Sequence, residues 1–275
     1  MKLAFSTNAF KRYSLEESIK EIASIGYEGV ELLCDIPHAY PPNFDKERIQ
    51  SVGNLLSSLS MQISNLNAFT LYAIGDVYHP SWIEESNDLR ELRIQHTIDC
   101  LSLANKMDVK NISTEPGGPL PESYSTPQLE KLFIEGLLRA SRIAEKENVR
   151  ILVEPEPFLL LENSKQFKNF MKKINSEFVR LNFDIGHFFC VREDPAQLVY
   201  ELLDYTEHFH LADIAQTREH NHLIPGQGSI DFASVFAAMN EIGYNGFVTV
   251  ELYPYQSNPV EAAQKAFDYL KDIAI

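Results

Sequence analysis

The stretch from Phe178 to Phe188, FVRLNFDIGHF in one-letter code, decides the fold of this chain. Apolar and polar residues alternate from Val179 to Asp184, and Gly186 then interrupts the pattern. This alternation is typical of a short strand, here with an acid at its end and His187 three residues later. Because barrel enzymes collect their chemistry at the carboxyl ends of their strands, the stretch predicts one part of an active site.

Three other strand-like runs end in the same kinds of residue. They are Arg150–Glu154, Glu207–His210 and Phe247–Glu251. A single acid at a strand end is usually a solvated terminus or a helix cap. Several carboxylates crowded together repel one another without a cation, so four such ends indicate one metal site built from distant parts of the chain. The predicted ligands are Glu154, Asp184, His210 and Glu251.

Length and composition favour one large α/β domain. The chain has 275 residues, 44% of them hydrophobic, and no linker or low-complexity tract divides it, so we expect a single domain over residues 1–275. No apolar signal or membrane-spanning segment is visible, and a cytoplasmic protein without membrane contact is expected. The net charge of -15 and the scattered Lys and Arg residues argue against nucleic acid as a partner.

The rest of the chain alternates strands with helices. Before the four runs above, we expect strands at Lys2–Thr7, Gly29–Leu33, Met61–Leu66 and Val109–Thr114. Ser14 and Glu17 form a capping box that predicts the start of the first helix. Thr126 is the expected N-cap of a later helix, with Pro127 at its first position.

Eight strand–helix units in a chain close to the usual ~250 residues predict a (β/α)8 TIM barrel. A doubly wound open sheet is the competing arrangement. No glycine-rich phosphate fingerprint follows the first strand, where Thr7–Phe10 stands instead, and this favours the barrel.

Side chains that share a face of a strand are two residues apart. Counting back from the predicted ligands places Asn182 below Asp184, His208 below His210 and Thr249 below Glu251. Polar groups at this depth are costly unless they hydrogen-bond the layer above. We therefore expect Asn182 and His208 to support the metal ligands from beneath.

Three carboxylates and one imidazole form a hard, oxygen-rich site. Such a site fits Mn²⁺ or Mg²⁺ best, and Co²⁺ or Zn²⁺ with open coordination positions is the alternative. Open positions bind water or substrate oxygens. We therefore expect a substrate with a carbonyl beside a hydroxyl. Trp82 is expected in a loop after a strand, where its ring can form part of the wall of a sugar-binding pocket.

Several motifs together resemble the sugar isomerase/epimerase proteins of the xylose isomerase-like TIM-barrel superfamily. They are Glu154 in VEP, Asp184 and His187 in DIGH, His210 in HLAD, the segment Pro225–Gly228 (PGQG) and Glu251 in VEL. The superfamily includes ketose 3-epimerases, hydroxypyruvate isomerase, inosose and dehydroshikimate dehydratases, and nucleases of the endonuclease IV type. The resemblance covers the whole chain in strand order.

The resemblance implies the same four metal ligands, and it adds substrate contacts. His187 is expected to reach a substrate hydroxyl, Arg218 to bind substrate, and Glu156 or Glu162 to supply a further carboxylate. The implied reaction is proton transfer through an enediolate, with Glu154 and Glu251 as the two acid–base residues.

Four functions stay open at this point. The first is an isomerase or epimerase acting on a small sugar or polyol-like substrate, in a chain that can form a homo-oligomer. The second is a lyase that dehydrates a related ketone. A nuclease would need additional histidines on the earlier strands, which end near Asn8, Glu31, Asn67 and Glu115 instead. A non-catalytic binding module is disfavoured because the ligand set is complete.

His220 and His222 fall in a polar loop and are expected to be solvated, although His222 can reach the pocket.

Overall fold

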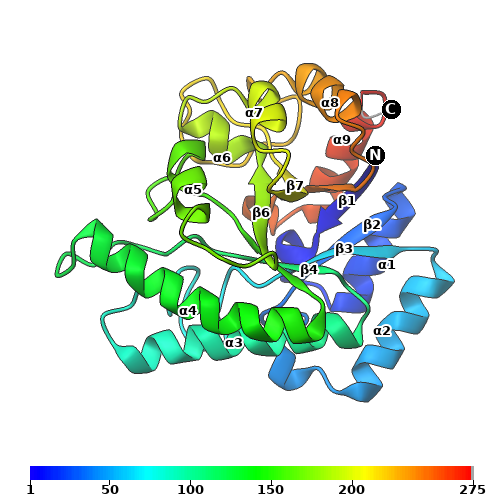
Figure 1. The fold of residues 1–275 in the computed structure, drawn as a ribbon. Coiled ribbons are helices and arrows are strands. Elements are labelled where there is room, and N and C mark those ends of the chain that lie inside the picture. Colours follow the sequence, from blue (N-terminus) through cyan, green and yellow to red (C-terminus); the bar gives the residue numbers. More distant parts are fainter. Residues whose placement is uncertain (274–275) are drawn as a thin grey trace.

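Eight parallel strands close into a barrel in chain order in the computed structural model, which describes residues 1–273 (Figure 1). The strands are β1 Lys2–Ser6, β2 Gly29–Leu33, β3 Gln62–Asn67, β4 Asn111–Thr114, β5 Arg150–Val153, β6 Val179–Asp184, β7 Thr206–Leu211 and β8 Phe247–Val250. β1 pairs in parallel with β8 as well as with β2, so the sheet has no open edge. The predicted TIM barrel is confirmed.

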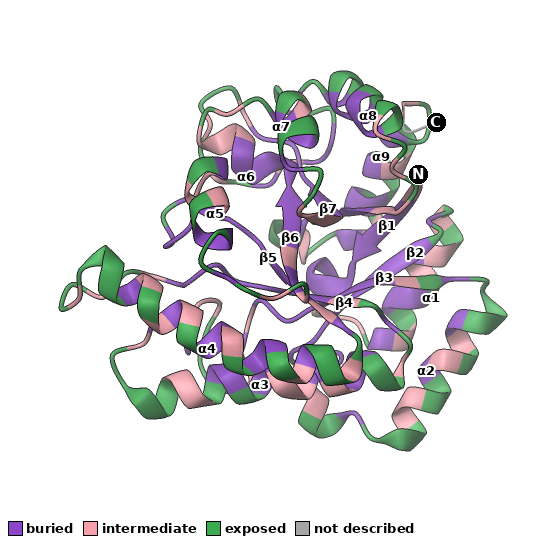
Figure 2. Ribbon diagram, in the orientation of Figure 1, coloured by how far each residue is buried: buried purple, intermediate pink, exposed green. Residues whose placement is uncertain are grey.

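Helices surround the barrel, buried on the face toward the strands and exposed outside (Figure 2). They are α1 Leu15–Ile25, α2 Lys46–Ser58, α3 Asn87–Lys106, α4 Thr126–Glu147, α5 Ser164–Met171, α6 Ile185–Cys190, α7 Pro195–Glu201, α8 Phe232–Glu241 and α9 Pro259–Leu270, with short 3₁₀ segments η1 Thr7–Phe10, η2 Pro41–Asn43 and η3 Tyr253–Tyr255. None of the helices within residues 1–273 is long and apolar enough to cross a membrane.

Alternation along the strands separates an apolar outer layer from a polar interior. On β6 and β7, Phe183 and Phe209 pack against each other with ring centroids 5.0 Å apart. Their neighbours on the opposite face, Asn182 and His208, are register partners inside the barrel. The outer aromatic layer supplies apolar burial, and the inner face is left to carry functional groups.

Several element boundaries differ from the sequence prediction by one or two residues, and three of them concern a helix cap or a candidate ligand. The N-cap of α4 is Ser125, one residue before the predicted Thr126, because the Ser125 hydroxyl and amide pair with Gln128 in a capping box. β5 and β8 end one residue earlier than predicted, so Glu154 and Glu251 are the first residues beyond their strands.

Two buried charges hold the loop after β3 in place. The Asp35 carboxylate, in the loop after β2, accepts hydrogen bonds from Thr70 Oγ1 at 2.8 Å and from the Tyr72 amide at 2.5 Å. The Arg93 guanidinium of α3 donates to the Phe69 carbonyl at 3.0 Å. Charge-assisted hydrogen bonds to loop backbone restrict its motion, so this loop is a fixed wall at the carboxyl end of the barrel.

The capping box of α1 gives a test of local stability. The Ser14 hydroxyl accepts from the Glu17 amide at 3.2 Å, and Glu17 pairs back with the Ser14 amide at 2.9 Å. We expect Ser14→Ala to lower the free energy of unfolding by about 1 kcal/mol, measured by urea denaturation. Ser51→Ala, at an exposed site inside α2, is the control and should change it by less than about 0.5 kcal/mol. Equal effects of the two changes would contradict the capping role.

Candidate active site

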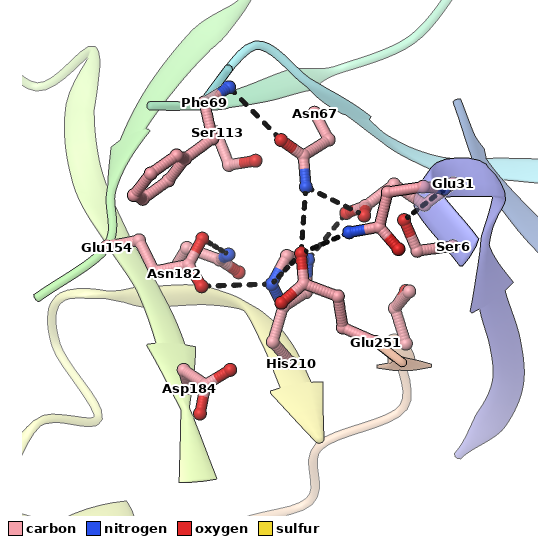
Figure 3. Close-up of polar contacts among 12 residues, drawn as sticks. Ser6, Glu31, Asn67, Phe69, Ser113, Glu154, Asn182, Asp184, His210 and Glu251 are labelled. Carbon is pink, nitrogen blue, oxygen red and sulfur yellow. Dashed lines mark hydrogen bonds and ion pairs between the residues drawn. The ribbon is translucent and has the colours of Figure 1, made fainter. Parts of the chain in front are cut away.

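The four predicted metal ligands meet at the carboxyl end of the barrel (Figure 3). Glu154, Asp184, His210 and Glu251 are all buried, and each offers one ligand atom within 4.8 Å of the others. His210 Nδ1 lies 3.1 Å from Glu154 Oε1 and 3.9 Å from Glu251 Oε1. Residues almost 100 positions apart in the chain therefore form one compact cluster, as the strand-end pattern predicts.

Asp184 shows why the cluster fits a cation. Its Oδ1 accepts the His187 amide at 2.7 Å and so caps the N-terminus of α6. Its Oδ2 is buried and has no hydrogen-bond partner within residues 1–273. A buried carboxylate oxygen without a partner is costly, and a divalent cation among these oxygens removes that cost.

A residue that the sequence analysis did not assign, Glu31 on β2, orients the histidine ligand. Glu31 Oε2 lies 2.6 Å from His210 Nε2, and both residues are fully buried. Asn65 and Asn67 donate to the Glu31 carboxylate at 2.8 and 3.1 Å. A proton on Nε2 directed at Glu31 leaves the Nδ1 lone pair for a metal ion, which is the usual carboxylate–histidine–metal arrangement.

The charges around His210 change its protonation. Burial disfavours a charged imidazole, but attraction to Glu154, Glu31 and Glu251 outweighs burial and raises the pKa of His210 well above its usual value. Burial also opposes ionisation of Glu31, yet the charge and hydrogen bond of His210 lower the pKa of Glu31 to about 2. Burial, with repulsion from Glu154, raises the pKa of Glu251 well above its usual value. A metal ion at Nδ1 must therefore displace a firmly held proton.

Side-chain amides support the carboxylates. Asn182 Nδ2 donates to Glu154 Oε2 at 2.8 Å. The alternation places Asn182 below Asp184 on β6, but its side-chain hydrogen bond is made to the neighbouring carboxylate after β5. Asn8 and Asn67 both donate to Glu251 Oε1, at 2.7 and 3.2 Å. The other predicted supporting residue, His208, has its Nε2 3.9 Å from Glu31 Oε2 and no hydrogen-bond partner for that nitrogen within the described chain.

A cavity of about 220 Å³ opens above the cluster. Glu156 and His187, both expected to contact substrate, line it. Tyr78, from the loop after β3, donates its hydroxyl to Glu156 Oε1 at 2.7 Å. The other lining residues are Asn8, Lys11, Leu33, Asn67, Phe69, Thr70, Tyr72, Val77, Glu154, His220, Glu251, Tyr253 and Gln256.

Three histidines meet beside this cavity, which corrects the expectation that His220 and His222 are solvated. His222 is 1% exposed, and its Nε2 lies 3.4 Å from His187 Nε2 and 3.3 Å from His220 Nε2. His187 Nδ1 and His222 Nδ1 face the backbone carbonyls of Pro155 and Glu251 at 3.0 and 2.9 Å. Each Nδ1 must donate there, so the Nε2 lone pairs of His187 and His222 are left to accept a proton or hydrogen bond.

The turn Pro225–Gly228 explains how a polar loop holds His222 beside the cavity, in contact with the lining residues His187 and His220. The amides of Gly226 and Gly228 donate to Asp213 Oδ2 at 2.9 and 2.7 Å. A Cβ on Gly228 would lie 2.3 Å from Asp213 Oδ1, so the close approach requires glycine. Asp213 also forms a bridge of two backbone hydrogen bonds with Leu223, which follows His222. The segment Pro225–Gly228 thus folds around the Asp213 carboxylate.

The comparisons with known proteins agree with this architecture. A family model described as xylose isomerase-like TIM barrel matches residues 19–273. The chain belongs to this family. A curated relative, the inosose dehydratase of Clostridium beijerinckii, is 23% identical over 95% of this chain and 90% of its own.

Solved structures of similar proteins share the fold. A D-tagatose 3-epimerase-like protein gives a TM-score of 0.80 at 22% identity, covering 99% of this chain and 98% of its own. The IolI protein, solved with a bound zinc atom, gives 0.81 at 19% identity, covering 100% of this chain and 98% of its own. At these identities the likeness establishes the barrel itself.

Two substrate contacts expected from the sequence do not lie in the cavity. Trp82 is a core residue, 1% exposed, whose Nε1 donates to Thr114 Oγ1 at 3.0 Å. Arg218, expected from the family resemblance to bind substrate, stacks its guanidinium 4.0 Å from the Phe189 ring centroid and donates to the Phe189 carbonyl at 2.5 Å. Arg218 is thus bound to the segment after β6 and does not line the cavity.

The contact between Glu31 and His210 predicts an effect on metal affinity. We expect Glu31→Gln to weaken binding of Mn²⁺ or Zn²⁺ by about 10- to 100-fold, because the neutral amide no longer holds the Nε2 proton as a carboxylate does. Competition with a chromophoric chelator measures the affinity. Glu28→Gln, at an exposed position just before β2, is the matched control and should bind as the wild type does. Wild-type affinity in a folded Glu31→Gln protein would rule out this role.

The raised pKa of His210 predicts that metal affinity depends on pH. Below that pKa the imidazole is protonated, so affinity should fall as the pH is lowered and rise as it is increased. At pH 7 each bound ion should release about one proton or more. Calorimetry in two buffers with different ionisation heats counts the protons, and a count of zero would contradict the assigned charge state.

Proposed function

We propose that this protein is a divalent-metal-dependent isomerase or epimerase that moves a proton on the carbon beside the carbonyl of a small polyhydroxy ketone. The observation that carries the proposal is the cluster of Glu154, Asp184, His210 and Glu251, with its unpartnered Asp184 oxygen, at the floor of a small cavity. One divalent ion per chain, Mn²⁺ or Mg²⁺ by preference and Co²⁺ or Zn²⁺ as alternatives, matches these ligands.

A divalent ion at this position supplies Lewis-acid polarisation of the substrate carbonyl. The chain's own residues then handle the proton. Either Glu154 or Glu251 takes it from the carbon beside the carbonyl, and the other returns it to the opposite face or to the adjacent carbon. Asn8 and Asn67 hold Glu251 through one oxygen, which fixes the carboxylate for this step. The Nε2 lone pair of His187, which lines the cavity, accepts a hydrogen bond from a substrate hydroxyl and orients it.

A dehydratase is the second candidate, and the inosose dehydratases among the curated relatives favour it. The first step is the same proton removal, and the second is loss of a hydroxyl from the next carbon as water. Glu156 lines the cavity beside Tyr78 and can donate the proton that this hydroxyl needs. Burial, with repulsion from Glu154, raises the pKa of Glu156 well above its usual value, which favours the protonated acid that this step needs.

Metal content and proton exchange together test the proposal. After expression with Mn, Mg, Co and Zn, we expect about one divalent ion per wild-type chain by mass spectrometry and none in the double variant Asp184→Ala, His210→Ala. In D₂O, NMR of a panel of ketoses should show exchange of the proton beside the carbonyl with the wild type and at least ~100-fold slower exchange with Glu251→Gln.

The two candidate reactions differ in their product. An isomerase or epimerase returns a sugar of unchanged mass, whereas a dehydratase releases an unsaturated ketone that absorbs in the ultraviolet. A folded wild type that binds no divalent ion under any of these conditions would overturn both candidate reactions.

Homo-oligomer formation and a cytoplasmic location stay predictions of the sequence.

A further inference from the structure

A lysine lines a cavity whose other titratable side chains are glutamates, histidines and tyrosines. Lys11 follows η1 and is the only Lys or Arg among the described residues that line the cavity, where Glu154, Glu156 and Glu251 also stand. The proposed metal ligands include three carboxylates, those of Glu154, Asp184 and Glu251. Their combined negative charge exceeds the positive charge of one divalent ion. The floor of the cavity therefore repels an anion, and its single ammonium attracts one.

The Lys11 ammonium has no ion-pair partner within residues 1–273, where no carboxylate oxygen lies within 4.0 Å of Nζ. Asp35 is the acid whose charge acts on it most. The Asp35 oxygens are already engaged by donors from the loops after β2 and β3, including Thr70 Oγ1 at 2.8 Å and the Ile36 amide at 2.8 Å. Three ammonium donors thus remain for another acceptor.

A tyrosine holds the ammonium at the rim of the cavity. Lys11 Nζ lies 4.0 Å from the ring centroid of Tyr72, a cation–π contact. Tyr72 is itself fixed through its amide, which donates to Asp35 at 2.5 Å. The lysine is half-buried, and this burial lowers the pKa of its ammonium. A positioned and partly dehydrated cation binds an anion more strongly than a freely solvated one.

Lys11 lies nearer the solvent than the proposed metal ligands, which are all buried. Asn8, at the inner end of η1, contacts Glu251. Lys11 is three residues later, roughly 6 Å along a 3₁₀ helix. Its neighbour Tyr72 is 39% exposed, which places this contact at the solvent side.

We infer that Lys11 binds an anionic group, a carboxylate or a phosphate ester, at the end of the substrate remote from the reacting carbonyl. The inference rests on the proposed function for the position of the reacting end. It narrows the substrate class to acidic derivatives of small polyhydroxy ketones. The alternative is that Lys11 only supports the Tyr72 ring, in which case neutral and anionic ligands bind alike.

Three probes with the same ketone end separate these possibilities. D-Fructose, D-fructuronate and D-fructose 6-phosphate differ only at the carbon farthest from the carbonyl, where they carry a hydroxyl, a carboxylate or a phosphate. Calorimetric titration of the Mn²⁺-loaded wild type should show at least one of the two anions binding about tenfold tighter than fructose. Preference for one anion identifies the carboxylate or the phosphate, and equal preference indicates recognition of charge alone.

The variant Lys11→Gln should lose this tenfold preference while its affinity for fructose changes less than about twofold. Lys11→Arg should keep part of the preference, and Lys20→Gln, exposed on α1, should keep all of it. The inference is overturned if the wild type binds both anions no tighter than fructose, or if Lys11→Gln retains the preference. Absence of proton exchange in D₂O with every ketose of the panel, neutral or anionic, would count against the proposed function, whereas the binding preference alone tests Lys11.

Discussion

The imidazole of His210 lies between two carboxylates, Glu31 at one ring nitrogen and Glu154 at the other. The rest of the site depends on this contact, because it gathers like charges where water cannot screen them. Only a proton or a metal ion at that imidazole balances the cluster. The surrounding amides of Asn8, Asn67 and Asn182 stabilise the carboxylates by hydrogen bonds without neutralising them. The site therefore keeps its affinity for a cation.

The sequence predicted the barrel and the meeting of Glu154, Asp184, His210 and Glu251 because both follow from local rules. Side chains alternate along a strand, and the carboxyl ends of the strands share one face of the barrel. Glu31 was missed as a functional residue because all five residues of β2 are buried, so its inward direction is not visible as an apolar–polar pattern. The positions of His222, Trp82 and Arg218 depend on loop paths. His222 is held beside the cavity by the turn that folds around Asp213, and no sequence periodicity links these residues.

Asp184 shows how one residue joins the fold to the chemistry. It is the last residue of β6 and the N-cap of α6. One carboxylate oxygen caps the helix, and the other faces the cluster. Asp184 Oδ1 acts as the helix cap, and Oδ2 is the atom that we propose as a metal ligand. Because the cap fixes the side-chain torsions, the free oxygen is directed at the cluster before any ligand arrives.

The distribution of the cluster along the chain has a consequence during synthesis. Glu31 emerges from the ribosome early, whereas Glu251 lies in the last tenth of the 275 residues and follows the strand that pairs with β1. A nascent chain that stops before β8 thus holds unbalanced carboxylates and an open sheet edge, both of which favour capture by chaperones or proteases. Only a chain that includes β8 can close the barrel and bring Glu251 to the cluster.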